Sequence, residues 1–118
     1  MTTVCEPLTY LRPTGEHEAA ADGAIMELVR VDAGGTATVA RLDAATCRDW
    51  LRLIATSLWV WADEGLVDGT QQLAYGEGSA TERPRVVIPA GIAHKWAADL
   101  ALALWHHAPR PTRARGRQ

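Results

Sequence analysis

Residues 86–96 read VVIPAGIAHKW, and this stretch decides the fold that the sequence predicts. It opens with three β-favouring apolar residues. Pro89 has no backbone N–H and therefore ends a strand ladder, and Gly91 permits the positive φ of a tight turn. If the chain re-enters as a new strand, His94 and Trp96 share one face of it. We therefore expect a strand, a turn and a second strand that points a histidine inward.

Short segments with strand character recur along the rest of the chain, separated by turn signals. They lie at residues 8–11, 24–31, 36–42, 57–65, 71–78, 83–91 and 100–107. In SLWVWADEG (57–65), Trp59 and Trp61 share one strand face. LALALWHH (100–107) alternates leucine and alanine; its composition also suits a helix, but its short length and the Ala-Pro-Arg-Pro that follows favour a strand.

One segment has helical spacing. In DAATCRDWLRLIA (43–55), Asp43 is a suitable N-cap. Cys47, Trp50, Leu51 and Ile54 follow at i, i+3, i+4 and i+7, which places them on one helix face. The same residues also fit a loop that leads into a strand. We expect at most one short helix here, near residues 44–54.

The pattern as a whole predicts an all-β sandwich or barrel, because strands recur at short spacing without βαβ alternation. The 118 residues are long enough for one domain with its own core. We expect an N-terminal arm (1–23), a barrel (24–108) and a disordered basic tail (109–118), since the tail is rich in Arg, Pro and Gly.

Composition and charge exclude several classes of protein. A net charge of −2 gives no reason to expect nucleic-acid binding or attraction to an anionic membrane. Cys5 and Cys47 lack metal-binding spacing, and no signal peptide or spanning segment is recognisable. We expect a reduced, cytoplasmic protein.

Pro89, Gly91 and His94 stand as P-A-G-I-A-H, which resembles the second conserved motif of the cupin superfamily, P-x-G-x-x-H. The resemblance spans roughly residues 24–107 and implies a jelly-roll β-barrel with a ligand cavity. The motif is incomplete, because Arg83 and Ala98 stand where full versions have Gly and Asn.

The first cupin motif, which supplies two histidines and a glutamate to the metal, has no counterpart near residues 51–58. His94 alone cannot form a catalytic metal site, which needs about three protein ligands. We therefore expect no metal and no other cofactor. A rearranged metal site would have to recruit Glu16, Glu27, His17, His106 or His107.

The resemblance implies that His94 faces the cavity as an acid or base. Glu27 is the second catalytic candidate, because it shares a face with apolar residues of its strand. Five tryptophans and no phenylalanine suggest a cavity lined by indole rings. The expected substrate-binding residues are Trp59, Trp61, Trp96, Tyr75, Arg41 and Arg52.

The sequence thus predicts a small-molecule-binding protein, and in first place a metal-independent isomerase, epimerase or cyclase of bacterial specialised metabolism. The substrate is expected to be apolar or aromatic. One alternative is a ligand-binding protein or sensor without catalysis; another is a metal-dependent cupin oxygenase with a rearranged site. We also expect a homodimer, because pairing covers exposed sheet edges.

Overall fold

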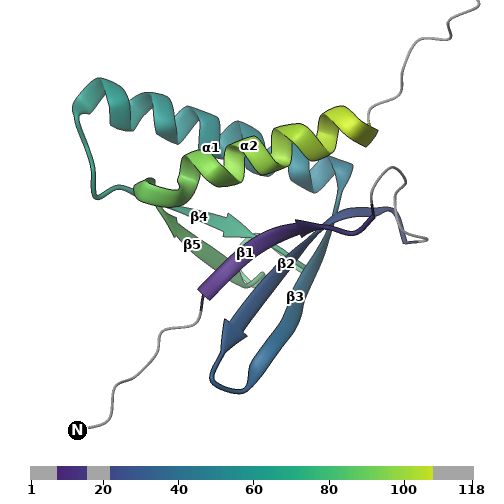
Figure 1. The fold of residues 1–118 in the computed structure, drawn as a ribbon. Helices are drawn as coiled ribbons and strands as arrows, with labels where there is room; N and C mark the ends of the chain where they lie inside the picture. The colour runs from purple at the N-terminus through teal and green to yellow at the C-terminus, as the bar shows by residue number, and fades with distance from the viewer. Residues whose placement is uncertain (1–7, 16–21, 108–118) are drawn as a thin grey trace, which may run out of the picture.

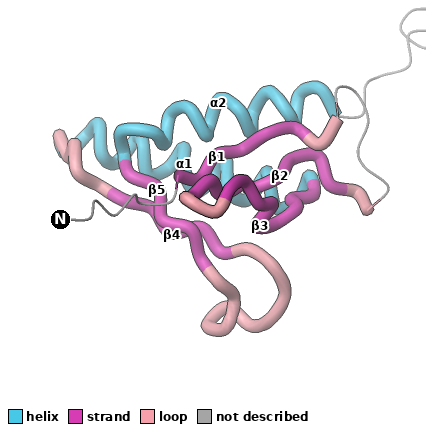
Figure 2. Tube along the Cα trace, turned by 60° about the horizontal axis from the view of Figure 1, so that its bottom comes forward, coloured by secondary structure: helices cyan, strands magenta, loops and turns pink. Residues whose placement is uncertain are grey.

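The computed structural model describes residues 8–15 and 22–107, which form two small antiparallel sheets and two long helices (Figure 1). In chain order the elements are β1 (Leu8–Pro13), β2 (Ala24–Asp32), β3 (Gly35–Asp43), α1 (Ala44–Glu64), β4 (Thr70–Ala74), β5 (Arg85–Pro89) and α2 (Ala90–His107). The helices lie side by side and antiparallel on one side of the molecule, and the strands lie on the other (Figures 1 and 2). The architecture is therefore an α/β mixture with no closed barrel among the described residues.

The larger sheet has the order β1-β2-β3, and β4 and β5 form a separate two-stranded ribbon. β2 is central; its first six residues are buried or half-buried, whereas Arg30 and Asp32 near its end are exposed. Two register shifts interrupt the pairing of β2 with β3, one around Ile25 and one between Leu28 and Val29. Such irregularities bend and twist a strand pair, which suits a short sheet wrapped under two helices.

α1 forms because its residues meet three helical requirements together. The Asp43 carboxylate accepts a hydrogen bond from the Thr46 N–H at 2.8 Å and so caps the N-terminus. Gly65 ends the helix in the left-handed conformation, with φ 69°, which few residues other than glycine adopt easily. The buried residues of α1 recur at helical spacing and form one apolar face: Cys47, Trp50, Ile54 and Trp61.

The two helices and the ribbon meet at a pair of buried tryptophans. The rings of Trp50 in α1 and Trp96 in α2 are stacked, with centroids 6.2 Å apart and an interplanar angle of 14°. The indole N–H of Trp50 donates to the Ala74 carbonyl at the end of β4, at 3.0 Å. The surrounding core includes Leu11, Met26, Leu28, Leu42, Leu73, Ile88 and Leu100.

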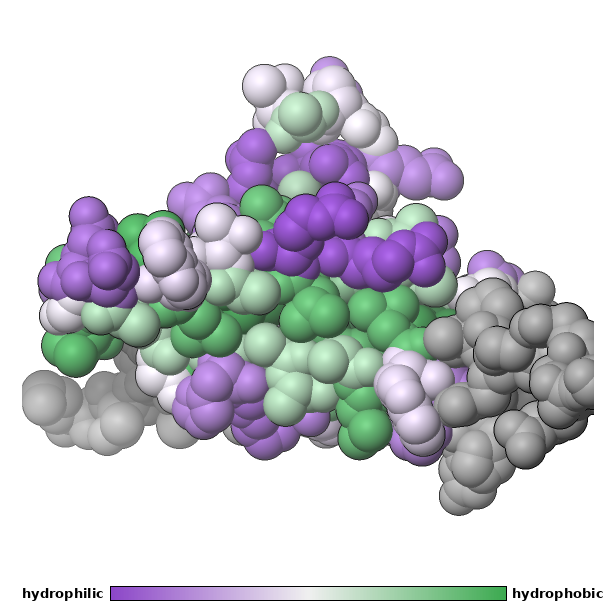
Figure 3. Space-filling model, turned by 90° about the horizontal axis from the view of Figure 1, so that it is seen from above, coloured by the Kyte–Doolittle hydropathy of each residue, from purple (hydrophilic) through white to green (hydrophobic). Residues whose placement is uncertain are grey.

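The outer surface of the helical layer is not uniformly polar. Seen from above, it shows a band of hydrophobic atoms along the middle, with hydrophilic groups on both sides (Figure 3). Several large apolar side chains of the helices are exposed: Leu53, Trp59, Val60, Ile92, Leu102 and Trp105. The helical side therefore carries apolar area that the described residues do not cover.

The all-β, cupin-like jelly roll predicted from the sequence is wrong, because two expected strands are halves of helices. Residues 57–64 belong to the second half of α1, where Leu58 and Trp61 continue the face begun by Ile54 at i+4 and i+7, and Gly65 is its C-cap. Residues 100–107 belong to α2. The high helix propensity of alanine and leucine prevails there over the apparent alternation.

The motif that suggested a barrel also has a different structure. Pro89 ends β5 as expected, but α2 begins at once with Ala90, whose N–H donates to the Gly69 carbonyl at 2.7 Å. No turn intervenes, and Gly91 does not adopt a positive φ. Because this segment is helical, His94 and Trp96 lie on different faces: His94 is exposed and Trp96 is buried.

Other expected elements exist. Strands β1, β2 and β3 cover residues 8–11, 24–31 and 36–42, and the helix expected near 44–54 is the first part of α1. The expected arm contains β1, which pairs with β2 along its length. Residues 1–7 and 16–21 of that arm, and the expected tail 109–118, lie outside the described residues.

We predict that Gly69→Ala lowers the free energy of unfolding by about 1–3 kcal/mol, the usual cost of overpacking. A Cβ at Gly69 would overlap the indole ring of Trp61, and the Gly69 backbone is held by its bond to Ala90. Gly91→Ala is the matched control, because nothing lies within 4 Å of its added Cβ. Urea titrations should show no loss for the control; equal stability of both variants would contradict the predicted contact.

Candidate functional site

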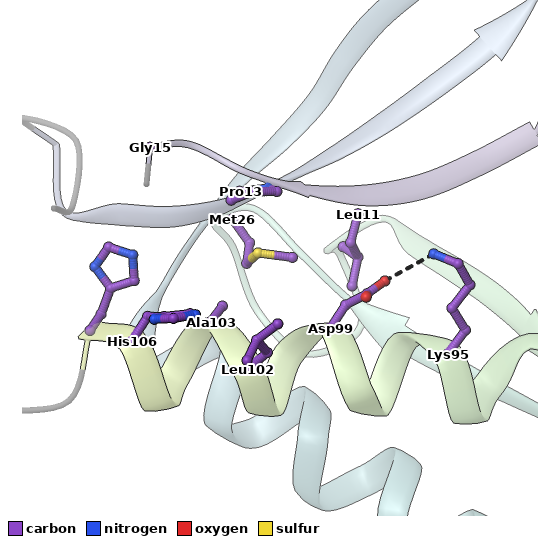
Figure 4. A pocket seen from close by; sticks show the side chains of 10 residues that line it. Leu11, Pro13, Gly15, Met26, Lys95, Asp99, Leu102, Ala103 and His106 are labelled. Carbon is purple, nitrogen blue, oxygen red and sulfur yellow. Dashed lines mark hydrogen bonds and ion pairs between the residues drawn. The ribbon is translucent and has the colours of Figure 1, made fainter. Parts of the chain in front are cut away.

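A pocket of about 380 Å³ lies between α2 and the strands β1 and β2 (Figure 4). Leu11 and Pro13 are two residues apart in β1 and therefore share a face, and Met26 pairs with Pro13 across the strands. Leu102 and Ala103 of α2 form the opposite wall. These five residues give the pocket an apolar part on both sides.

Polar groups line the α2 side of this pocket. Lys95 and Asp99 are one turn apart and form an ion pair at 3.3 Å. His106 and His107 follow in the last turn of the helix, and the His106 ring meets the Trp105 ring edge-on with centroids 5.4 Å apart. The site thus combines an apolar interior with an ammonium, a carboxylate and two imidazoles.

The two expected catalytic residues are not in this pocket, nor do they share a site. His94 lies on the exposed side of α2. Glu27 neighbours Met26 in β2, and successive strand residues point to opposite faces, so Glu27 lies on the outer face of the sheet. Its carboxylate accepts hydrogen bonds from Arg12 at 2.9 Å and from Arg41 at 2.7 Å.

These outer-face charges form a network across the sheet. Arg12, Glu27 and Arg41 stand on β1, β2 and β3 respectively, and Arg41 also bonds Asp22 at 2.7 Å. The hydrogen bond from Arg41 lowers the pKa of Asp22 to about 2, with help from the Ala24 N–H. Arg41, expected to bind substrate, is therefore engaged in holding the strands together.

The tryptophans do not line a common cavity among the described residues. Trp61 and Trp96 are buried in the core, whereas Trp59 is 70% exposed on α1. Tyr75 and Arg41 border a second cavity of about 260 Å³, and Arg52 borders a third of about 320 Å³. The two cavities share Thr46 and Arg83, so Tyr75, Arg41 and Arg52 lie in one region of the surface, away from the pocket under α2.

Within the described residues, no three His, Cys, Asp or Glu side chains are placed to hold a metal ion. Cys47 is buried, and burial raises the pKa of its thiol to about 12. A thiol with so high a pKa is a poor nucleophile and a poor metal ligand at neutral pH. No helix among the described residues is long and apolar enough to cross a membrane.

The site predicted from the sequence does not contain most residues of this pocket; His106 and His107 are predicted only as possible ligands of a rearranged metal site. A signal was present in α2, where Lys95, Asp99, Leu102 and His106 follow at i, i+4, i+7 and i+11. That spacing places them on one helix face. The predicted strand over residues 100–107 does not have this helical spacing.

We predict that Asp22→Asn removes the part of the free energy of unfolding that depends on the ionised Asp22 carboxylate and is lost at acidic pH. The folded pKa of Asp22, about 2, is below its ordinary value of 3.8, so its contribution is complete above pH 3.8 and is lost as the pH falls towards 2. In urea titrations the variant should be less stable near neutral pH and change less on acidification. Asp68→Asn is the matched control, because that carboxylate forms no ion pair among the described residues. Identical pH profiles for wild type and Asp22→Asn would contradict the assignment.

The chain was also compared with known proteins. No protein-family model matches it, no curated protein matches its sequence, and no solved structure matches its fold. None of these comparisons identifies it as a cupin. Its function must therefore be inferred from the geometry described above.

Proposed function

We propose that this protein binds a small, mostly apolar molecule carrying one acidic group in the pocket between α2 and β1. The observation that carries the proposal is the pocket itself: apolar side chains from β1, β2 and α2 line a space of about 380 Å³, and hydrogen-bond donors gather on one side. Small-molecule sites have this combination of an apolar lining with a few placed polar groups.

The size of the pocket limits the ligand. Binding sites for small molecules usually measure roughly 300–1,000 Å³, and this pocket is near the lower limit. Met26 supplies a flexible thioether side chain to one wall, as Figure 4 shows, and such a side chain adapts to ligands of different shape. A single ring system or a short acyl chain suits this interior.

The polar side chains favour an acid over a neutral ligand. Lys95 has three ammonium protons, and its bond to Asp99 uses one of them. The imidazole of His107 offers a further N–H group. Donors outnumber the single carboxylate of the pocket, so a ligand carboxylate or sulfonate would find partners here.

Binding without turnover is the form of the proposal that the geometry supports best. The expected acid–base chemistry needs His94 and Glu27 near one substrate, and proton transfer requires hydrogen-bond reach. His94 is exposed on α2, and Glu27 is held by two arginines on the outer face of the sheet. We therefore favour a ligand-binding or sensor role over an isomerase.

We predict that 1-anilinonaphthalene-8-sulfonate, an apolar fluorophore with one acidic group, binds saturably to this pocket. Leu102→Trp places a larger side chain at the exposed edge of the wall and should abolish the saturable component. Lys95→Glu reverses the charge beside the apolar interior and should weaken binding about fivefold or more, which corresponds to about 1 kcal/mol. Fluorescence titration of the folded variants measures both effects.

Two variants on other surfaces control for these changes. Leu53→Trp makes the same substitution at an exposed leucine of α1, and Arg30→Glu makes the same charge change on β2. Both should bind the fluorophore as the wild type does. If all four variants bind it equally, the pocket is not the binding site.

A further titration tests the acidic group. We predict that 2-naphthoate displaces the fluorophore and that 2-naphthol, with the same ring system, does so about tenfold less well, since a charge-assisted bond is stronger than a neutral one. This preference should disappear in Lys95→Glu. If both compounds compete equally in the wild type, the pocket does not select for an acidic group on the ligand.

A further inference from the structure

The outermost face of α1 carries a second arrangement of side chains, unrelated to the pocket. We call Arg48, Arg52, Ala55, Trp59 and Asp63 the α1 stripe. Their spacing of four, three, four and four residues places them on one helix face, turned away from the buried face of α1. All five are exposed, including Trp59 at 70% and the Arg52 side chain at 76%.

The charges of the stripe are distributed opposite to the way that the dipole of α1 favours. α1 has no acidic residue in its first turn and no basic residue in its last turn. Instead, Arg48 and Arg52 stand in its first half, where Arg52 pairs with Asp49 at 3.8 Å, and Asp63 and Glu64 stand at its C-terminal end. The helix dipole disfavours carboxylates there. The arrangement is therefore not explained by the stability of α1 alone.

The stripe is complementary to the same stripe of a second copy that runs in the opposite direction. Read from one end it is basic, basic, small, aromatic and acidic. When a second α1 is laid against the first in the opposite direction, Arg48 meets the partner's Asp63 and Arg52 meets the partner's Trp59. Ala55 then faces the partner's Thr56 near the two-fold axis, where two small side chains permit close approach.

We infer that two copies of this chain pair through antiparallel α1 helices in this register. The two-fold axis makes each contact occur twice, giving two Arg48–Asp63 ion pairs and two Arg52–Trp59 cation–π contacts. Because opposed helix dipoles also attract, the C-terminal carboxylates of each α1 gain a favourable environment beside the N-terminal half of the partner.

The size of this surface sets the expected affinity. α1 has 21 residues, so its length is about 30 Å, and two helix faces about 10 Å wide bury about 600 Å² in total. Stable interfaces usually bury about 1,200 Å² or more. We therefore expect a dissociation constant in the micromolar range, about 1–100 µM.

Charge reversal tests the register directly. Sedimentation equilibrium of the full chain, from about 5 to about 500 µM, should show a monomer–dimer equilibrium in the wild type. Arg48→Asp and Asp63→Arg should each weaken it about tenfold or more, because like charges then face each other. The double variant carries the pair with exchanged signs and should return to within about threefold of the wild type.

Loss of folding cannot imitate this result. Arg48→Asp adds a negative charge to the first half of α1, and Asp63→Arg adds a positive charge to its last turn, and both changes agree with the helix dipole. The thermal transition of each variant should therefore be unchanged or higher. Arg30→Glu, with a comparable charge change on the outer sheet, should dimerise as the wild type does.

Three outcomes would overturn the inference: a wild type that stays monomeric over the whole range, single variants that dimerise normally, or a double variant that fails to recover. The stripe and the pocket lie on different sides of the helical layer, so fluorophore binding by the charge-reversal variants separates the two proposals. Fluorophore binding should be the same in these variants as in the wild type, whether or not the chains pair.

Discussion

The stack of Trp50 on Trp96 is the contact on which the arrangement of the other elements depends. It joins α1 to α2, and the Trp50 indole N–H ties both helices to the end of β4. The two sheets are not paired with each other, so this contact adds to the burial of Leu73 and Ile88 in holding the ribbon of β4 and β5 to the core. Two flat rings at this point also fix how far apart the helix axes lie.

The position of α2 explains why a pocket lies between this helix and β1. The buried Trp96 holds α2 over the core, where Ala103 packs in the same buried cluster as Leu11 of β1, and the pocket remains beside this contact. Small and flexible residues, Ala103 and Met26, stand opposite each other across this space. A larger residue than Ala103 would fill it, so the pocket follows from side-chain size as much as from the fold.

The sequence predicted the first three strands and the start of α1, because β-branched alternation and a capped i, i+3, i+4 pattern are local signals. It could not separate helix from strand in residues 57–65 and 100–107, because the apolar residues of both segments fit either period. In the second case the short length of the segment and the Ala-Pro-Arg-Pro that follows it outweighed the alanine and leucine propensity. The pocket could not be predicted from local sequence patterns, because tertiary packing alone brings Leu11 and Leu102 to the same pocket.

The ion network on the outer face of the sheet has a consequence for the opposite face. Arg12, Glu27 and Arg41 occupy one strand each, and a slip of β1 by a single residue would turn Arg12 towards the helices and expose Leu11. The network therefore stabilises the correct register of the three strands over a shifted one. Charges that never touch the pocket determine which side chains form its wall.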